Sequence, residues 1–344
     1  MIMGKIIRIG TRESELAIWQ ATQVKDLLKQ SGIASELVYI KSEGDIDTVT
    51  PLYALGVISV FTKTLDAALL NNRIDIAVHS MKDVPVQLAE GIQQAAVLKR
   101  GSYKDILVLH PDLSERNTPF TVNHVSITTP GSKTKDRDNS WSLPLREHTD
   151  KPGKPEDVVI ATSSFRRIAQ WLNRYPRHKI ENLRGNVNTR LKKLKESNWH
   201  GAIFAAAGLE RINLRPKNSI ELDWMLPAPA QGAIMVVCRE DDDYVFESCQ
   251  SFNDEETTLC TKIERDFLSA LMGGCSTPIS ALAKVRNGSV TFQGNIASPD
   301  GKEILSAGVR SPVADSSKIA RTAVEGILSQ GGQVVIDKFR NATK

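Results

Sequence analysis

Several features that mark whole classes of protein are scarce or missing in this 344-residue chain. Its four cysteines form no C-x-x-C pair and accompany no histidine cluster, which argues against a zinc site. No apolar run approaches the ~20 residues of a membrane-spanning helix. A formal net charge of +4, without interleaved aromatic residues, is too small to indicate nucleic-acid binding. We therefore expect no metal, no membrane and no nucleic-acid partner.

The first residues also lack the pattern of a secretory signal. Residues 1–8 contain no long apolar region followed by a small-residue cleavage site, and they resemble the first strand of a sheet. Scattered thiols in a chain of this length fit a reducing compartment, where disulfides are not needed for stability. The sequence therefore predicts a cytoplasmic protein, which we expect to be a monomer.

Strand-like and helix-like patterns alternate through residues 5–78 and again through residues 158–206. This alternation predicts mostly parallel sheets covered by helices, and two such units in series predict two domains that face each other across a cleft. Ser14 is placed to cap the first long helix, at about residues 15–30. From about residue 254, a helix, three strand-like runs and a further helix predict a small α+β domain.

The changes of pattern also set the expected domain limits. The first domain is discontinuous, because the apolar run at 233–237 is expected to return to the first sheet. The limits of the first, second and third domains are 1–104 with 230–247, 105–229, and 248–344. The polar stretch at about 112–156 lacks clear periodicity, so we expect a solvated excursion and assign it no chemistry.

Four short motifs place cations or small polar groups where a strand ends or a helix begins. They lie at residues 10–14 (GTRES), 79–85 (HSMKDVP), 162–167 (TSSFRR) and 182–190 (NLRGNVNTR). In open α/β sheets, ligands bind at the carboxyl ends of strands, where helix N-termini point outward. The cations expected to converge there are Arg12, Lys82, Arg166, Arg167, Arg184 and Arg190. Such a cluster repels itself strongly unless a polyanionic ligand compensates it.

Each motif also has a plain structural interpretation. The hydroxyls of Thr162–Ser164 could do no more than cap a helix, and the arginines could pair with surface carboxylates. Arginine predominates over lysine, however, which suits bidentate binding of carboxylates or phosphates. Asp83 is the exception in sign, since a lone carboxylate in a basic cleft can stabilise a cationic intermediate or exchange a proton.

Cys275 follows two glycines and precedes Pro278, so its thiol is expected on a loop after a long helical stretch. Alone this is weak evidence, because buried structural cysteines are common. The cationic motifs strengthen the case for a functional cysteine, because they suggest that an anionic group lies beside this thiol.

Taken together and in this order, the motifs resemble those of the porphobilinogen deaminase (hydroxymethylbilane synthase) family nearly from end to end. The matching segments are 11–14, 75–85, 162–167, 183–191, 206–211, 231–233 and 273–275. The resemblance implies a transferase that joins four porphobilinogen molecules head to tail into hydroxymethylbilane, a step of tetrapyrrole and haem biosynthesis. It also implies one covalent dipyrromethane cofactor per chain, attached as a thioether to Cys275.

The resemblance further assigns roles to individual residues. Asp83 matches the catalytic carboxylate, which assists loss of ammonia, stabilises the azafulvenium cation and helps to deprotonate the new linkage. The residues expected to bind cofactor or substrate are Arg12, Ser14, Gln20, Ser80, Lys82, Thr162, Ser163, Ser164, Arg166, Arg167, Arg184, Gly185, Arg190 and Gln231.

The chain departs from the family pattern in two places. Ile58 stands where the family's active-site lid has a lysine, a few residues before Phe61, so we expect this lid to dock by apolar contact. The stretch at 126–150 is about twenty residues longer than the family's usual connection, which is typical of an added surface excursion.

A non-catalytic, two-domain anion-binding protein of the periplasmic-binding type is the alternative, because its fold would be similar. The absence of a signal peptide and the presence of Asp83 and Cys275 argue against it. Intact mass separates the two hypotheses, since only the enzyme carries a covalent cofactor. The expected fold class is α/β, with two doubly wound, periplasmic-binding-protein-like domains around a cleft and a small α+β C-terminal domain.

Overall fold

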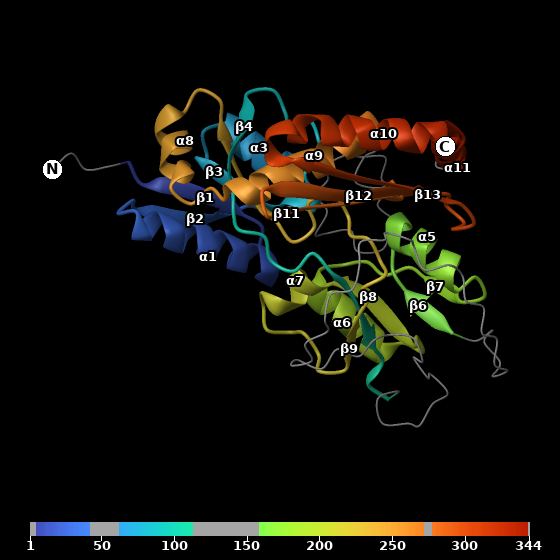
Figure 1. Cartoon of the computed structure of the whole chain (residues 1–344). Coiled ribbons are helices and arrows are strands. Elements are labelled where there is room, and N and C mark those ends of the chain that lie inside the picture. Colours follow the sequence, from blue (N-terminus) through green and yellow to red (C-terminus); the bar gives the residue numbers. More distant parts are fainter. Residues whose placement is uncertain (1–4, 42–61, 113–157, 272–276, 343–344) are drawn as a thin grey trace.

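The structure is a computed structural model that describes residues 5–41, 62–112, 158–271 and 277–342. In these ranges the chain forms two five-stranded sheets and one three-stranded sheet. Figure 1 shows the three-stranded sheet and its helices beside the first sheet, with the second sheet below both. The expected α/β fold, with two sheet-containing domains and a C-terminal domain, is confirmed. None of the described helices combines the length and the hydropathy needed to cross a bilayer.

The first sheet has the strand order β2-β1-β3-β10-β4. Its strands are β1 (Ile7–Thr11), β2 (Ser35–Tyr39), β3 (Ile76–Ser80), β4 (Ile92–Val97) and β10 (Ile234–Arg239). The helices that pack on it are α1 (Glu15–Gln30), α3 (Lys63–Leu70) and α8 (Asp243–Gln250). The predicted first helix is confirmed, and Ser14 caps it by accepting a hydrogen bond from the Ala17 amide.

Alternate residues of the central strands face opposite layers of helices. In β3, Ile76 and Val78 pack in one core with α1 and α8, whereas Ala77 packs in the other core with α3. In β10, Val236 packs in the core with α1 and α8, and Met235 packs in the core with α3. Because both faces of the sheet are buried, its inner strands consist of nearly continuous apolar runs.

The second sheet has the order β7-β6-β8-β5-β9. Its strands are β5 (Asp105–Leu109), β6 (Val159–Ala161), β7 (Lys179–Glu181), β8 (Gly201–Ala205) and β9 (Ser219–Glu221). Its helices are α5 (Phe165–Arg174), α6 (Val187–Glu196) and α7 (Ala206–Glu210). Trp171 of α5 covers one face and Leu194 of α6 the other, so this sheet is also buried on both sides.

Each five-stranded sheet contains one strand that is antiparallel to both of its neighbours. β10 is antiparallel to β3 and β4, and β5 is antiparallel to β8 and β9. In both cases it is the strand that follows a passage of the chain from one sheet to the other. The prediction that the run at 233–237 returns to the first sheet is therefore confirmed, while the strand direction was not foreseen.

The two crossing segments touch each other closely. The Gly101 amide donates to the carbonyl of Gly232 at 3.0 Å. Gly232 has a φ of +89°, and a Cβ there would lie 2.6 Å from the Ser102 carbonyl oxygen. Only glycine fits at this position, because a side chain would force the crossing segments apart.

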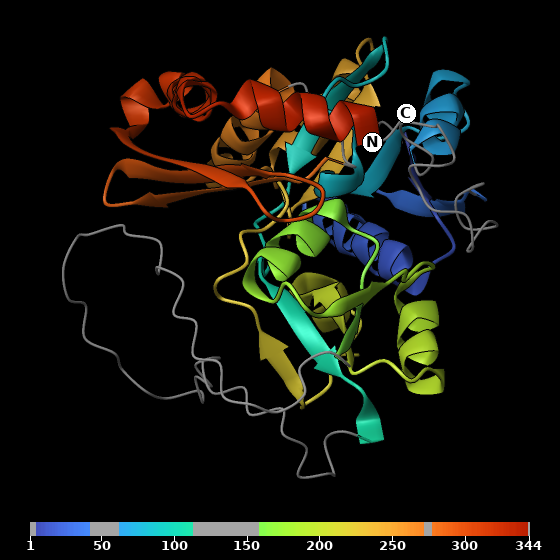
Figure 2. The same cartoon turned by 90° about the vertical axis from the view of Figure 1, so that its right-hand side faces the viewer.

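The C-terminal domain contains α9 (Glu255–Ala270), β11 (Ile279–Arg286), β12 (Ser289–Ala297), β13 (Ile304–Pro312), α10 (Ile319–Ser329) and α11 (Gly332–Ala342). Figure 1 shows α10 running along β12 and β13, and Figure 2 shows both C-terminal helices, in red, above that hairpin. Phe267 of α9 and Phe292 of β12 meet edge to face in the core, with ring centroids 5.1 Å apart. The helix and three strands predicted here are confirmed, as is α10, whereas α11 was not predicted.

The C-terminal domain contacts both sheet domains. Glu264 of α9 is fully buried, pairs with Arg100 of the first crossing and accepts from the Ala230 amide of the second. On the other side, Gln170 of α5 donates to Ser280 at 3.0 Å. The domain therefore bridges the two halves at their crossing. The predicted domain limits along the chain stay a prediction.

Candidate active site

The motif at 79–85 forms the end of β3 and a short 3-10 turn, Met81–Asp83. Met81 and Val84 are almost fully buried, and the Val84 amide closes the turn on the Met81 carbonyl at 3.2 Å. These two apolar anchors leave Lys82 half-buried and Asp83 exposed. The turn thus presents one cation and one carboxylate side by side at the end of a central strand.

Asp105, the first residue of β5, lies fully buried at the centre of an ionic network. Its Oδ2 accepts from Arg166 Nη1 at 2.7 Å, and its Oδ1 accepts from Arg167 Nη2 at 2.7 Å and Arg167 Nε at 3.0 Å. Gln231 Nε2 donates to the same Oδ1 at 3.0 Å. Burial alone raises the pKa of Asp105, but the charges of Arg166 and Arg167 hold it well below the ordinary range.

This network changes one step of the sequence argument. We expected a ligand to compensate all the clustered cations, but Asp105 already compensates part of the charge of Arg166 and Arg167. Both guanidinium groups are also fixed by backbone carbonyls, Arg166 by that of Leu226 and Arg167 by that of Ile203, each at 2.9 Å. Sequence reasoning missed Asp105, although an acid at the head of an otherwise apolar strand was the available signal.

The charges around the turn influence one another, which shows that they lie close together. Burial lowers the pKa of Lys82 to about 8, with Arg167 and Arg166 lowering it further and Asp83 and Asp105 raising it. Burial likewise lowers the pKa of Arg190 to about 10, with Arg167 and Arg184 adding to the effect and Asp83 opposing it. The structure therefore brings six of the predicted site residues into one region: Lys82, Asp83, Arg166, Arg167, Arg184 and Arg190.

Two strand-end loops of the second domain are tied together beside this region. Ser163 Oγ donates to the Leu183 carbonyl at 2.8 Å and accepts from the Leu183 amide at 2.9 Å. The buried Arg184 follows in this loop, next to Gly185. Gly185 has a φ of +110°, a conformation that any other residue could adopt only with strain. Arg190 Nε donates back to the Gly185 carbonyl at 2.7 Å, which fixes that side chain against the loop.

The hydroxyl residues of the third motif have different roles. Ser164 lies at the N-cap position of α5 but makes no side-chain cap bond. Thr162 is buried, and its Oγ1 accepts from the Ser164 amide at 3.4 Å. The simple helix-capping interpretation therefore does not describe this motif.

In the first domain, the predicted residues form a smaller polar group around the end of β3. Gln20 Nε2 donates to Ser80 Oγ at 2.9 Å. Burial, together with the charge of Arg12, lowers the pKa of His79 to about 4, so this imidazole is neutral near pH 7. Its Nε2 has no hydrogen-bond partner among the described residues. Sequence reasoning quoted His79 only as part of a motif.

Three predicted residues, Cys275, Ile58 and Phe61, lie outside the described residues. The other cysteines are free and buried, and burial raises the pKa of Cys238 to about 11 and those of Cys249 and Cys260 to about 12. In the described ranges, His, Cys, Asp and Glu form no group of three or more that could hold a metal ion.

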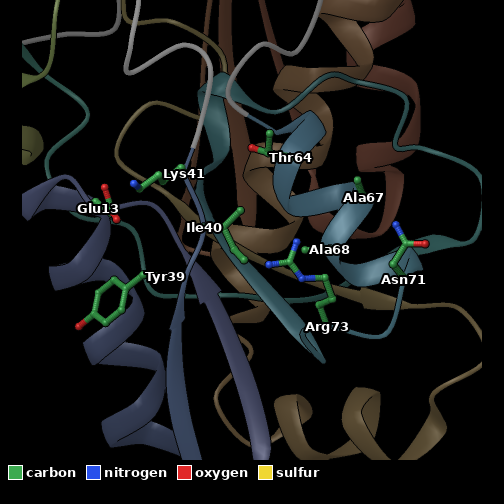
Figure 3. A pocket seen from close by; sticks show the side chains of 9 residues that line it. All are labelled: Glu13, Tyr39, Ile40, Lys41, Thr64, Ala67, Ala68, Asn71 and Arg73. Atoms are coloured by element: carbon green, nitrogen blue, oxygen red, sulfur yellow. The ribbon is translucent and has the colours of Figure 1, made fainter.

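A separate cavity of about 520 Å³ opens between the end of β2 and α3 (Figure 3). Its lining residues are Glu13, Tyr39, Ile40, Lys41, Thr64, Ala67, Ala68, Asn71 and Arg73. None of them belongs to the predicted site, and Lys41 is the last described residue before the gap at 42–61. The cavity therefore lies apart from the group of predicted residues at the Asp83 turn.

Two solved structures are weakly similar to this chain. A nutrient binding protein from Burkholderia cenocepacia bound to methionine has a TM-score of 0.39 at 13% identity, covering 73% of this chain and 93% of that one. The BvgS VFT2 domain of Bordetella pertussis has a TM-score of 0.38 at 11% identity, covering 72% and 85%. Scores this low carry no argument, so the fold rests on the sheets described above.

Sequence comparisons are far more specific. The family model for the dipyrromethane-cofactor binding domain of porphobilinogen deaminase matches residues 7–247, and the model for the C-terminal domain of that enzyme matches residues 258–329. A porphobilinogen deaminase of Acidithiobacillus ferrooxidans is 34% identical over 348 residues, covering 99% of this chain and 100% of the relative. The chloroplastic enzyme of Pisum sativum is 38% identical over 339 residues, covering 95% and 82%. With both family models matched in order along the chain, this chain belongs to the porphobilinogen deaminase family.

Proposed function

We propose that this chain is a hydroxymethylbilane synthase, a transferase that polymerises four porphobilinogen molecules head to tail with loss of ammonia. The observation that carries the proposal is the position of Asp83, exposed on its turn among the cations Lys82, Arg167 and Arg190. Porphobilinogen carries acetate and propionate side chains, which such a cluster can bind. The non-catalytic alternative is not favoured, because it leaves the exposed carboxylate at the centre of an anion site unexplained.

The described residues fit the dipyrromethane cofactor that the family model implies. Among the described residues, the electrostatic neighbours of this region include five cations, Lys82, Arg166, Arg167, Arg184 and Arg190, and two carboxylates, Asp83 and Asp105. The pKa values of Lys82 and Arg190 are lowered chiefly by burial, so the described residues offset the burial of these charges only in part. When bound, the cofactor supplies the growing end of the chain. Its carboxylates would be held by Lys82 and the four arginines. Arg12, after β1, and Ser164, before α5, are further candidates.

Cys275 is the proposed attachment residue. The thiolate is the nucleophilic form of cysteine, and the raised pKa values of Cys238, Cys249 and Cys260 leave almost none of it near neutral pH. All three are also buried in hydrophobic cores. The resemblance to the family at 273–275 points to the fourth thiol.

Asp83 is the proposed catalytic residue. A carboxylate beside the reacting carbon can stabilise the positive charge that develops as the substrate loses ammonia. The neighbouring arginines would orient the substrate through its carboxylates, which keeps the reacting carbon near Asp83. Ser14, Gln20, Ser80, Thr162, Ser163, Gly185 and Gln231 would support these groups, through the contacts described above. Ile58 and Phe61 are proposed to belong to an apolar lid.

The remaining assignments are also proposals. We infer a cytoplasmic monomer that binds no nucleic acid. The polar excursion at 112–156 is given no role in the reaction.

Mass spectrometry of the purified protein tests the proposal. The wild type should exceed the mass calculated from its sequence by one dipyrromethane unit, and Cys275→Ser should show the calculated mass. Cys249→Ser is the matched control and should retain the adduct. Wild-type protein without an adduct, and without ammonia release from porphobilinogen, would favour the binding-protein alternative.

A further inference from the structure

Arg265 of α9 is nearly fully buried, and none of the motifs discussed so far includes it. Its guanidinium donates to the backbone carbonyls of residue 81 and residues 84–86, at 3.4, 3.0, 2.5 and 3.1 Å in chain order. These carbonyls flank Lys82 and Asp83 on both sides. One side chain of the C-terminal domain therefore holds the turn that carries the proposed catalytic carboxylate.

The helix that contributes Arg265 also leads toward the proposed cofactor attachment. α9 ends at Ala270, and Cys275 follows shortly after it in the chain. The preceding residue, Glu264, bonds to the crossing segments. Successive helical residues point about 100° apart, so Arg265 is directed to a different side of the helix. Two neighbouring residues of α9 thus fix two different parts of the molecule: the crossing and the Asp83 turn.

The chemistry of the guanidinium explains how one side chain can fix this turn. It is planar and carries five N–H donors in set directions, so carbonyls bound to it are held at set positions relative to one another. An ammonium group is a single centre and cannot span the same set. Without Arg265 the turn would keep its own closing bond from the Val84 amide to Met81 and the buried side chains of both residues. Loss of Arg265 should therefore loosen the position of Asp83 more than it unfolds the turn.

We propose that Arg265 is a positioning residue for the deaminase reaction, which fixes the Asp83 turn to the helix that leads to Cys275. The inference rests on the assignment of Asp83 under the proposed function. A reacting group displaced by about 1 Å can lose ~10²-fold in rate, so a loosened turn is enough to slow the chemical step. Of the cations proposed to bind the substrate carboxylates, only Lys82 lies on this turn. The four arginines belong to the second domain, so KM should change far less than kcat.

The test compares Arg265→Met and Arg265→Lys with Arg100→Lys as the matched control. Arg100 is a partly buried arginine that bonds to α9, through Glu264, and it acts on the crossing rather than on the turn. Each holoenzyme is assayed for cofactor content by intact mass, for Tm, for kcat and KM, and for hydrogen exchange of the amides at 81–86. We expect Arg265→Met to lower kcat by ~10-fold or more per loaded enzyme and to speed exchange at 81–86, with Arg265→Lys between it and wild type. Arg100→Lys should lower Tm without either effect.

A double-mutant cycle separates positioning from general destabilisation. If Arg265 acts through Asp83, then Arg265→Met should cost much less in an Asp83→Asn background, measured as single-turnover ammonia release. Equal losses in both backgrounds would overturn the proposal, as would a kcat for Arg265→Met that matches Arg100→Lys. Should Arg265→Met not fold, Arg265→Lys decides by the same comparisons. If Asp83→Asn itself keeps wild-type kcat, the assignment of Asp83 fails, and unchanged exchange at 81–86 would then show separately that Arg265 does not hold the turn.

Discussion

Asp75 in the first sheet domain and Asp105 in the second are both fully buried carboxylates held between cations. Asp75 accepts from Arg8 Nε at 2.9 Å and Arg8 Nη2 at 3.0 Å, and it pairs with Lys5 at 3.1 Å and Arg239 at 3.3 Å. Asp105 pairs with Arg166 and Arg167, each at 2.7 Å. The two groups look alike as lists of charges, yet they lie at opposite ends of their sheets.

The position along the strand decides what each carboxylate does. Asp75 comes directly before β3, at the amino end of a parallel strand and away from the Asp83 turn. Asp105 opens the antiparallel β5 and pairs in register with Ala205, the last residue of β8. It therefore lies at the carboxyl edge, where ligands bind in such sheets. We infer that Asp75 serves stability alone, whereas Asp105 also holds two arginines in place for a ligand.

Solvent exposure of the partner cations separates the two groups further. The side chains of Lys5 and Arg8 are 45% and 34% exposed, whereas those of Arg166 and Arg167 are 4% and 6% exposed. Water screens Lys5 and Arg8 and can replace a lost partner, and the buried Arg239 keeps a second carboxylate, Asp242. Water cannot reach Arg166 and Arg167 in the same way. Removal of Asp105 should therefore have the larger consequence.

The largest effect is expected for Asp105→Asn. Two buried guanidinium groups would lose their carboxylate, and breaking a buried ion pair in this way typically costs about 3–5 kcal/mol. The arginines should also lose their fixed orientation, so cofactor content should fall. Urea unfolding and intact mass measure the two effects. A free energy of unfolding within about 1 kcal/mol of wild type would contradict the proposed role of Asp105.

A smaller effect is expected for Asp75→Asn, which is the matched change in the first domain. It removes charge-assisted hydrogen bonds, worth about 1.5–3 kcal/mol each when buried, but partly exposed Lys5 and Arg8 can be resolvated. Unfolding in urea should show a loss below that of Asp105→Asn. Cofactor content and kcat should stay at wild-type levels, and a loss of adduct in Asp75→Asn would remove the contrast between the two carboxylates.

Sequence patterns predicted the local parts of this fold well and the charge network poorly. Ser14 and the helix at 15–30 depend on neighbouring residues, and both are as predicted. Asp105 bonds to Arg166, Arg167 and Gln231, which lie 61 or more residues away in the sequence. No local sequence pattern links residues that far apart. The reversed direction of β5 has the same origin, because an apolar run of residues does not encode the direction of its neighbour.

The residues of the candidate site also differ in whether local sequence motifs could predict them. The motifs supplied Lys82, Asp83 and the arginines as a set, because each marks a strand end or a helix start. Arg265 could not be found in this way, since its contacts are to backbone carbonyls more than 170 residues away in sequence. Every residue has a backbone carbonyl, so the residue types at 84–86 do not indicate that an arginine binds there.

Acid should remove the contribution of both carboxylates. The pKa values of Asp75 and Asp105 are held well below the ordinary ~3.9 in the folded protein, so the unfolded chain binds more protons below about pH 4. Their stabilising contribution is thus complete above about pH 4 and is lost as pH falls further. Thermal unfolding of wild type and Asp75→Asn from pH 7 to pH 3 should show a Tm difference that narrows below pH 4. A constant difference would mean that folding does not lower the pKa of Asp75.

The smallest effect is expected from Lys82, whose pKa of about 8 reflects burial beside the Asp105 network. Its ordinary pKa is ~10.4, so the folded protein releases this proton earlier than the unfolded chain as pH rises. Above about pH 8 one cation of the cluster is lost, and binding of the substrate carboxylates should weaken by a few-fold, since several arginines remain charged.

Measurement of KM for porphobilinogen from pH 7 to pH 9 checks this expectation. KM should rise above pH 8 in the wild type, whereas Lys82→Gln should start with a higher KM and show a flatter profile. Asp75→Asn serves as the control here as well, because the remote carboxylate has no contact with Lys82 and should leave the profile unchanged. Parallel profiles for wild type and Lys82→Gln would assign the titration to another group, and Lys82 would then contribute its charge at every pH tested.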